Sequence, residues 1–150
     1  MLETDDVIAL LNDLSQTCED GEKGFRDAAE GLQDPTIRAL FIELGEEREA
    51  LATELQAEVR RLGGQPAESG SAAGAMHRGW INLKSALTGE DDAAIIAEAE
   101  RGEDVAKGAY EKALETALPS EVQYLVQRQY SRVRAAHDQV RDLKHATSAH

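Results

Sequence analysis

The chain has 150 residues, of which 41% are hydrophobic and 30% charged, and its formal net charge at pH 7 is -13. This composition is typical of one globular domain and excludes a disordered chain. The negative charge argues against binding to nucleic acid or to an anionic membrane surface, since both need clustered Lys and Arg, but it is compatible with cationic partners.

Helical periodicity dominates the first part of the chain. Apolar residues at three- and four-residue steps predict a first helix over about 5–32, with Thr4 as its expected N-cap. Asp34 is the expected N-cap of a second helix over about 35–62, whose first residue is a proline. This helix should end at Gly63, because glycine adopts the left-handed conformation at little cost.

The segment 64–89 is predicted to be a connection. It begins with a stretch rich in Gly, Ser and Ala, which is typical of a linker. Further on, Met76, Trp80, Leu83 and Leu87 share one face of a short amphipathic helix. We expect the indole of Trp80 to pack against the rest of the molecule, since large aromatic side chains are usually buried.

Two further long helices are predicted over about 91–117 and 119–146, separated by a tight corner at Pro119. No segment has the alternating pattern of a strand. The connection can run about 40 Å, the length of a helix of roughly 28 residues, so it can cross the whole bundle. The sequence therefore predicts an all-α, ferritin-like four-helix bundle with one long crossover that contains a short fifth helix, formed as a single domain over 1–150.

Ionisable residues interrupt the apolar stripe of each long helix. They are Glu22, Glu47, Glu100, Glu103 and His137. With a single crossover, the loop between the first two helices and the start of the third long helix share one end of the bundle. All five residues then lie at one level, about 15–20 Å from that end. Carboxylates and an imidazole that converge in a bundle core are the ingredients of a site for one or two metal ions, iron or manganese.

The pattern departs from the usual ligand set of a carboxylate-bridged di-metal centre. Such a centre takes a Glu from each of two helices and Glu-x-x-His from each of the other two. This sequence has Glu-x-x-Glu at 100–103, and Arg134 stands three residues before His137. A metal-free buried network is the alternative, because Arg48 and Arg101 lie at the same level and can pair with inward carboxylates. Some of these glutamates can also lie at the edge of a stripe and reach solvent.

Three glycines also share this level: Gly21, Gly45 and Gly102. Glycine inside a helix is unfavourable by about 1 kcal/mol relative to Ala, so its presence calls for a reason. Either these glycines let helix backbones approach one another closely or permit a π-bulge beside the site, or Gly21 simply kinks the first helix.

The cysteine content and the first residues of the chain favour the cytoplasm. Cys18 is the only cysteine and cannot form an internal disulfide, which suits a reducing compartment. The opening residues Met1 to Asp6 have no basic segment and precede no long apolar run, so neither a signal peptide nor a membrane span is expected.

Four segments carry a family resemblance: Leu11 to Leu14, Asp20 to Glu22, His77 to Lys84, and Glu100 to Glu103. They resemble a bacterial family of ferritin-like four-helix-bundle proteins of uncharacterised function, and His-Arg-Gly-Trp at 77–80 is the most specific part. The resemblance covers about residues 5–144. It implies the ferritin-like fold and a bacterial source, but it implies no activity.

Two classes of function follow. In the first, the Glu/His cluster binds metal, and the chemistry is iron oxidation or the handling of oxygen. In the second, the chain is a non-catalytic, stress-associated or scaffold bundle that works through its surface, and Arg48 neutralises the inward carboxylates. A homo-oligomer is compatible with both classes. Neither class assigns a substrate, or a role to His77 and Arg78.

Overall fold

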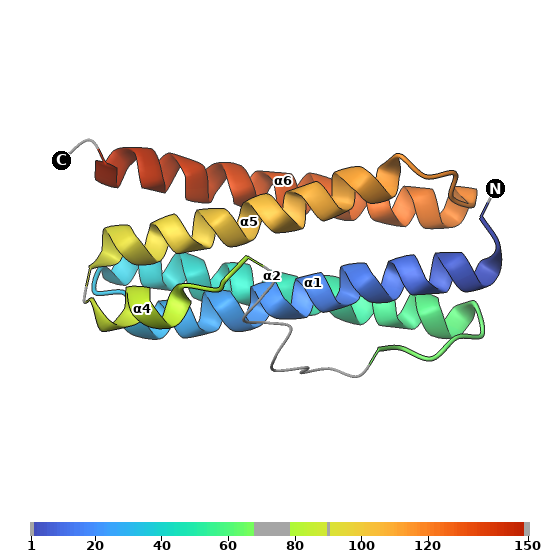
Figure 1. The fold of residues 1–150 in the computed structure, drawn as a ribbon, viewed down its shortest axis with the longest axis horizontal. Helices are drawn as coiled ribbons and strands as arrows, with labels where there is room; N and C mark the ends of the chain where they lie inside the picture. Colours follow the sequence, from blue (N-terminus) through green and yellow to red (C-terminus); the bar gives the residue numbers. More distant parts are fainter. Residues whose placement is uncertain (1, 68–78, 90, 149–150) are drawn as a thin grey trace.

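A computed structural model describes residues 2–67, 79–89 and 91–148 of the chain. The regular structure within these ranges is helical throughout: α1 (Thr4–Gly31), α2 (Pro35–Arg61), α4 (Leu83–Thr88), α5 (Asp92–Leu114) and α6 (Ser120–Ser148). The predicted all-α class, with four long helices and a short helix in the connection, is confirmed (Figure 1).

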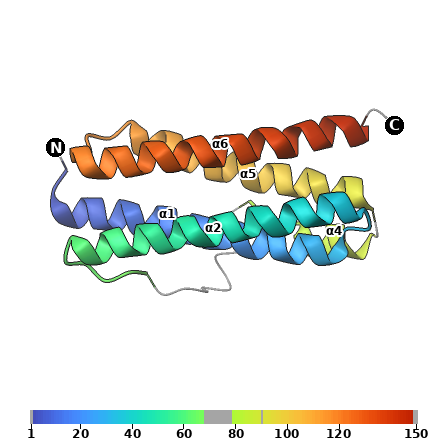
Figure 2. The same ribbon diagram turned by 180° about the vertical axis from the view of Figure 1, so that it is seen from behind.

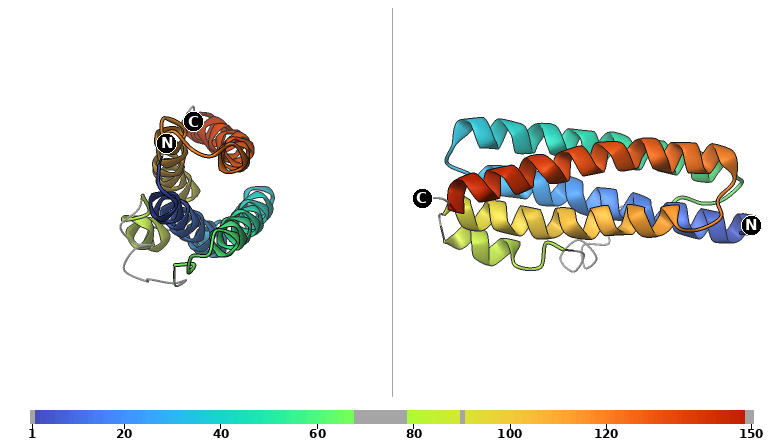
Figure 3. Two further views of the ribbon diagram at one scale, coloured as in Figure 1. Left: turned by 90° about the vertical axis from the view of Figure 1, so that its right-hand side faces the viewer. Right: turned by 90° about the horizontal axis from the view of Figure 1, so that it is seen from above.

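The four long helices lie side by side as two antiparallel hairpins (Figures 1 and 2). α1 pairs with α2, α5 pairs with α6, and the two hairpins meet mainly along α1 and α5. α4 packs against α1 and α5 on the outside of the bundle. α2 and α6 make few contacts with each other, and the end-on view in Figure 3 shows their ribbons well apart on one side of the bundle. We call this side the α2–α6 seam.

A carboxylate at the start of α5 fixes the order of the hairpins. Asp92 accepts hydrogen bonds from the backbone N–H groups of Gln33 and Asp34, at 2.8 and 2.9 Å. Gln33 and Asp34 form the turn between α1 and α2. The start of α5 therefore lies at the same end of the bundle as that turn, and the predicted single crossover is confirmed (Figure 1).

Several helix ends follow local sequence signals, but the start of α1 does not. Asp34 caps α2 by accepting from the N–H groups of the two residues after Pro35, as predicted. Gly63 follows α2 with a φ of 86°, in the left-handed region. The prediction for Thr4 is wrong, because Thr4 is already helical and Glu3, which precedes it, makes no side-chain capping bond.

The helix in the connection is shorter than predicted. It begins at Leu83, whereas the sequence predicted a helix that already included Met76 and Trp80. Trp80 lies just before α4, and Met76, His77 and Arg78 lie outside the described residues. The burial of Trp80 is confirmed, since only 2% of its surface is exposed.

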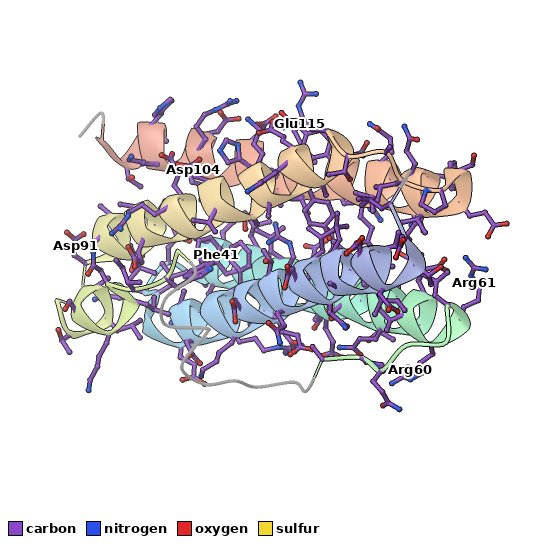
Figure 4. All side chains as sticks on the ribbon, turned by 45° about the vertical axis from the view of Figure 1, so that its right-hand side comes forward. Phe41, Arg60, Arg61, Asp91, Asp104 and Glu115 are labelled. Atoms are coloured by element: carbon purple, nitrogen blue, oxygen red, sulfur yellow. The ribbon has the colours of Figure 1, made fainter. Side chains whose placement is uncertain are left out.

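The core consists of two apolar clusters, one toward each end of the bundle. Phe41, labelled in Figure 4, is enclosed by the helices in one of them, whereas Arg60 and Arg61 project outward at the end of α2. On each long helix a short interval separates the two clusters. Arg48 and Glu103 lie in these intervals and are fully buried, so the middle of the core is a polar layer.

Among the described residues, no helix is both long enough and apolar enough to cross a membrane.

Candidate functional site

Arg48 and Glu103 form a buried ion pair at the centre of the polar layer. Nη2 of Arg48 lies 2.5 Å from Oε2 of Glu103, and the two side chains are 1% and 0% exposed. The pair joins α2 to α5 across the interior of the bundle. The pairing of Arg48 with an inward carboxylate, which the metal-free interpretation of the sequence predicted, is therefore observed.

A glycine and an aromatic ring accommodate the guanidinium. A Cβ atom on Gly21 would lie 2.9 Å from Nη1 of Arg48, so α1 can lie this close only because position 21 has no side chain. Cζ of Arg48 lies 5.6 Å from the ring centre of Phe25, within the range of a cation–π contact. Phe25 in turn contacts Phe41 and Trp80 edge to face, with ring centres 5.2 Å apart in both pairs.

The hydrogen-bonding capacity of this pair is only partly used. Oε1 of Glu103 and Nη1 of Arg48 are buried and have no hydrogen-bond partner among the described residues. Burial raises the pKa of the Glu103 carboxyl, and the Arg48 guanidinium acts against this rise. His137 lowers and Glu47 raises the same pKa, so both lie close enough to Glu103 to act on its charge.

His137 has a carboxylate at each ring nitrogen. Nε2 lies 2.7 Å from Oδ1 of Asp104, and Nδ1 lies 3.2 Å from Oδ1 of Asp138. Asp104 comes from α5 and is exposed at the junction with α6 (Figure 4). The imidazole is thus held between two carboxylates at the edge of the polar layer.

Glu22 faces away from the polar layer. Its carboxylate pairs with Arg26 at 3.1 Å, and Arg26 also binds Glu49 of α2 at 3.0 Å. Burial and the neighbouring Glu49 carboxylate raise the pKa of Glu22, while Arg26 lowers it. Glu22 therefore belongs to a surface network between α1 and α2.

Glu100 of α5 is held by a residue of α6. One of its oxygens accepts a hydrogen bond from Nζ of Lys144 at 3.0 Å. The second oxygen, Oε2, is buried without a partner among the described residues. Arg101, which the sequence offered as a further guanidinium for the core, pairs with Glu98 at 3.1 Å instead.

The donor set does not match a carboxylate-bridged di-metal centre. In such a centre the carboxylates and imidazoles face one another across the core. Here the Arg48 guanidinium lies against Glu103, and Glu22 faces Arg26. The part of the chain that the structure describes contains no group of three or more His, Cys, Asp or Glu side chains that could hold a metal ion. Metal binding by Glu22, Glu47, Glu100, Glu103 and His137 stays a prediction.

A second buried polar chain was not anticipated from the sequence. The hydroxyl of Tyr110 donates to Oε1 of Gln129 at 2.7 Å and lies 3.1 Å from Sγ of Cys18. The amide nitrogen of Gln129 donates to the backbone oxygen of Leu51 and to Glu54, at 3.2 and 2.7 Å. Burial raises the pKa of the Cys18 thiol to about 11, so the thiol stays protonated. The sequence feature that could have predicted this chain is Gln129, a polar residue on the apolar stripe of the last helix, because a buried amide needs hydrogen-bond partners.

Trp80 anchors the crossover in a cradle of glycines. A Cβ atom on Gly24 of α1 or on Gly102 of α5 would lie 2.4 Å from the indole, so both helices present bare backbone to the ring. Next to it, the backbone N–H of Asn82 donates to the buried Glu98 at 2.5 Å. The close approach at Gly102 is thus made by Trp80 and Gly79 of the crossover, whereas the sequence suggested the approach of another helix backbone.

Comparison with known proteins places the chain in a family. No curated protein matches it. Residues 6–116 match the family model described as "Domain of unknown function (DUF2383)". The match spans α1, α2, α4 and α5, and it includes both residues of the buried ion pair. Because the matched region covers most of the chain, the protein belongs to the DUF2383 family.

Proposed function

We propose that this protein is a non-catalytic, metal-independent helical bundle that works through binding at its surface. The observation that carries the proposal is the buried ion pair, because a permanent cation, Arg48, already lies against the central carboxylate of Glu103. In a metal centre the bound ion supplies that positive charge.

The guanidinium also disfavours a metal ion beside it. A divalent ion about 5 Å from the Arg48 charge would be repelled by roughly 7 kcal/mol at an effective dielectric constant of about 20. Metal could bind strongly at Glu103 only if Arg48 moved away. Such a movement would break the ion pair and the contact of Arg48 with Phe25.

Metal analysis and titration test the proposal. Protein purified without a histidine tag should contain no stoichiometric iron or manganese. Titration with Mn(II), followed by the electron paramagnetic resonance signal of the free ion, should show no saturable binding. Saturable binding that is lost in Glu103→Gln but kept in Glu115→Gln, a control at an exposed site near the end of α5, would overturn the proposal.

One observation favours a second candidate, the binding of a single iron or manganese ion. Oε1 of Glu103 and Oε2 of Glu100 are buried without a partner among the described residues. They belong to consecutive turns of α5, and carboxylate oxygens are suitable ligands for both metals. In this candidate, Arg48 would withdraw from Glu103 when the ion enters. Loss of Mn(II) binding in both Glu100→Gln and Glu103→Gln would select it over the metal-independent bundle.

We also propose that the chain is a bacterial, ferritin-like protein of the cytoplasm. The crossover topology, with two helical hairpins joined along the bundle, supports the ferritin-like classification. The free and buried thiol of Cys18 supports a reducing compartment.

A further inference from the structure

The α2–α6 seam contains a groove whose two walls carry opposite charges. The groove encloses about 560 Å³. Its charged residues are Glu46, Glu47, Glu49 and Glu54 on α2, and Arg128 and Arg132 on α6. Leu51 also lines the groove, as do the small side chains of Ala50, Thr53 and Ala57 on α2.

α6 is a basic helix in an acidic chain. It has five Arg or Lys residues and three Asp or Glu residues, which gives +2. α2 has four Arg and six Glu residues, which gives -2. One of the four, Arg48, is already paired inside the core, so the outer surface of α2 is more acidic still. The two helices that border the seam are therefore complementary in charge.

A single chain uses only part of this complementarity. Arg128 pairs with Glu54 across the groove, and this contact links α6 to α2. Arg132 and Glu46 are exposed on opposite walls, and neither forms an ion pair with a residue that the structure describes. These charges are available to a second molecule.

We propose that the α2–α6 seam is the interface of a homodimer in which α6 of each copy lies over α2 of the other. A two-fold axis parallel to the helices exchanges α2 and α6 but keeps every residue at its height along the bundle. Because Arg128 pairs with Glu54 and the two helices are antiparallel, Arg132 of one copy then lies about one helical turn from the level of Glu46 of the partner subunit, on the acidic wall of the groove. The same surface serves both copies, as a closed two-fold assembly requires.

The area of the seam is sufficient for a stable dimer. Two helices about 40 Å long and about 10 Å wide offer roughly 800 Å² per copy, which is the size of a standard protein interface. The small residues Ala50, Thr53 and Ala57 leave room for a partner helix to approach α2. Repulsion between two chains of charge -13 is screened beyond about 8 Å at physiological salt, whereas ion pairs in contact persist. The inference goes beyond the proposed function and does not depend on whether the core binds metal.

Light scattering coupled to size-exclusion chromatography tests the dimer on the full chain at physiological salt. Wild-type protein at micromolar concentrations should elute with twice the chain mass of 16.3 kDa. Arg132→Glu or Glu46→Arg alone should reduce the mass to that of one chain, because each places like charges opposite one another. The combination of both substitutions restores opposite charges and should restore the dimer. Lys84→Glu, which makes the same charge change as Arg132→Glu on the exposed surface of α4, is the control and should remain dimeric.

Circular dichroism establishes that each variant is folded, which is expected because Arg132 and Glu46 are both exposed. A wild-type monomer at every concentration would overturn the inference. So would a dimer that neither single charge reversal weakens, or a combined variant that stays monomeric.

Discussion

At position 48 a guanidinium replaces the apolar side chain that would continue the buried stripe of α2. Glu103 compensates its charge, the ring of Phe25 packs against the guanidinium, and Gly21 leaves room for it. A buried ion pair of this kind adds little stability compared with two apolar side chains, but removal of one partner costs about 3–5 kcal/mol. Replacing either Arg48 or Glu103 alone should therefore destabilise the fold, because the remaining charge would be buried without a partner.

Two glycines of α5 should respond in opposite directions to the same substitution. Gly102→Ala should lower the free energy of unfolding by about 1–3 kcal/mol, because the new methyl group overlaps the indole of Trp80. Gly108→Ala should raise it by up to about 1 kcal/mol, because alanine is the better helix former. Apart from its own helix backbone and its chain neighbours, a Cβ atom at Gly108 would meet no described atom within 4 Å, so this variant is the matched control. Urea unfolding followed by circular dichroism measures both changes. Equal effects at the two positions would contradict the docking of Trp80 on α5.

The buried thiol of Cys18 should make the fold less stable in alkali. Its pKa is about 11 in the folded chain against an ordinary value of 9.0, so between these pH values the unfolded chain loses a proton that the folded chain retains. The free energy of unfolding therefore falls as the pH rises through this range. Tyr110 acts in the same direction, since burial also raises its pKa. Urea unfolding at a series of pH values should give a shallower fall for Cys18→Ala. An identical slope would show that this thiol ionises equally in both states.

The crossover depends on a single side chain for much of its attachment. Trp80→Ala should lower the free energy of unfolding by about 3–5 kcal/mol, because it removes a large buried side chain and leaves a cavity between α1 and α5. Tyr124→Ala, at a site that is 70% exposed, is the control and should change it by less than about 0.5 kcal/mol. Trp80 is the only tryptophan, so its fluorescence reports on this site alone. Native emission at the wavelength of indole in water would be inconsistent with a docked ring.

The helices themselves were predictable from local features. The bounds of the two helices of the first hairpin followed from the periodic apolar residues and from the Asp-Pro and Gly-Gly signals. Each predicted end lies within one residue of the observed end. The start of α4 at Leu83 was missed because Trp80 is buried in a turn, and burial at helical spacing looks the same in sequence whether or not the backbone is helical. The predicted capping role of Thr4 is wrong because Glu3, one residue earlier, is the N-cap and Thr4 is already helical.

The candidate site was only partly predictable. The level of the polar residues followed from helix lengths and the crossover, and Arg48 was correctly identified as a compensating charge. The directions of the long side chains could not be predicted from the sequence. Glu22 and Glu100 occupy stripe positions, yet each carboxylate reaches a basic partner, Arg26 or Lys144. A flexible glutamate can leave the core in this way without any change in the helix that carries it.

Across the whole molecule, the two hairpins are joined at three places besides the contacts of Arg128 and Gln129 with α2. Asp92 holds the hairpins together at one end, Trp80 attaches the crossover between α1 and α5, and Arg48 and Glu103 connect α2 to α5 through the interior. The remaining side, the α2–α6 seam, is loosely closed and carries the charges that we assign to a dimer interface. In our proposals the core is neutralised within the chain, and the α2–α6 seam binds a second copy of the chain.

Thermal and urea unfolding of Arg48→Met, with and without Mn(II) or Fe(II), test most directly whether the chain neutralises its own core. If Arg48 is the permanent counter-charge of Glu103, Arg48→Met should lose about 3–5 kcal/mol, and the further change Glu103→Leu should recover much of that loss. Metal should alter neither the wild-type protein nor the variant. If metal stabilises both proteins, and Arg48→Met with metal is as stable as the wild type, then a metal ion and not Arg48 is the counter-charge of the core.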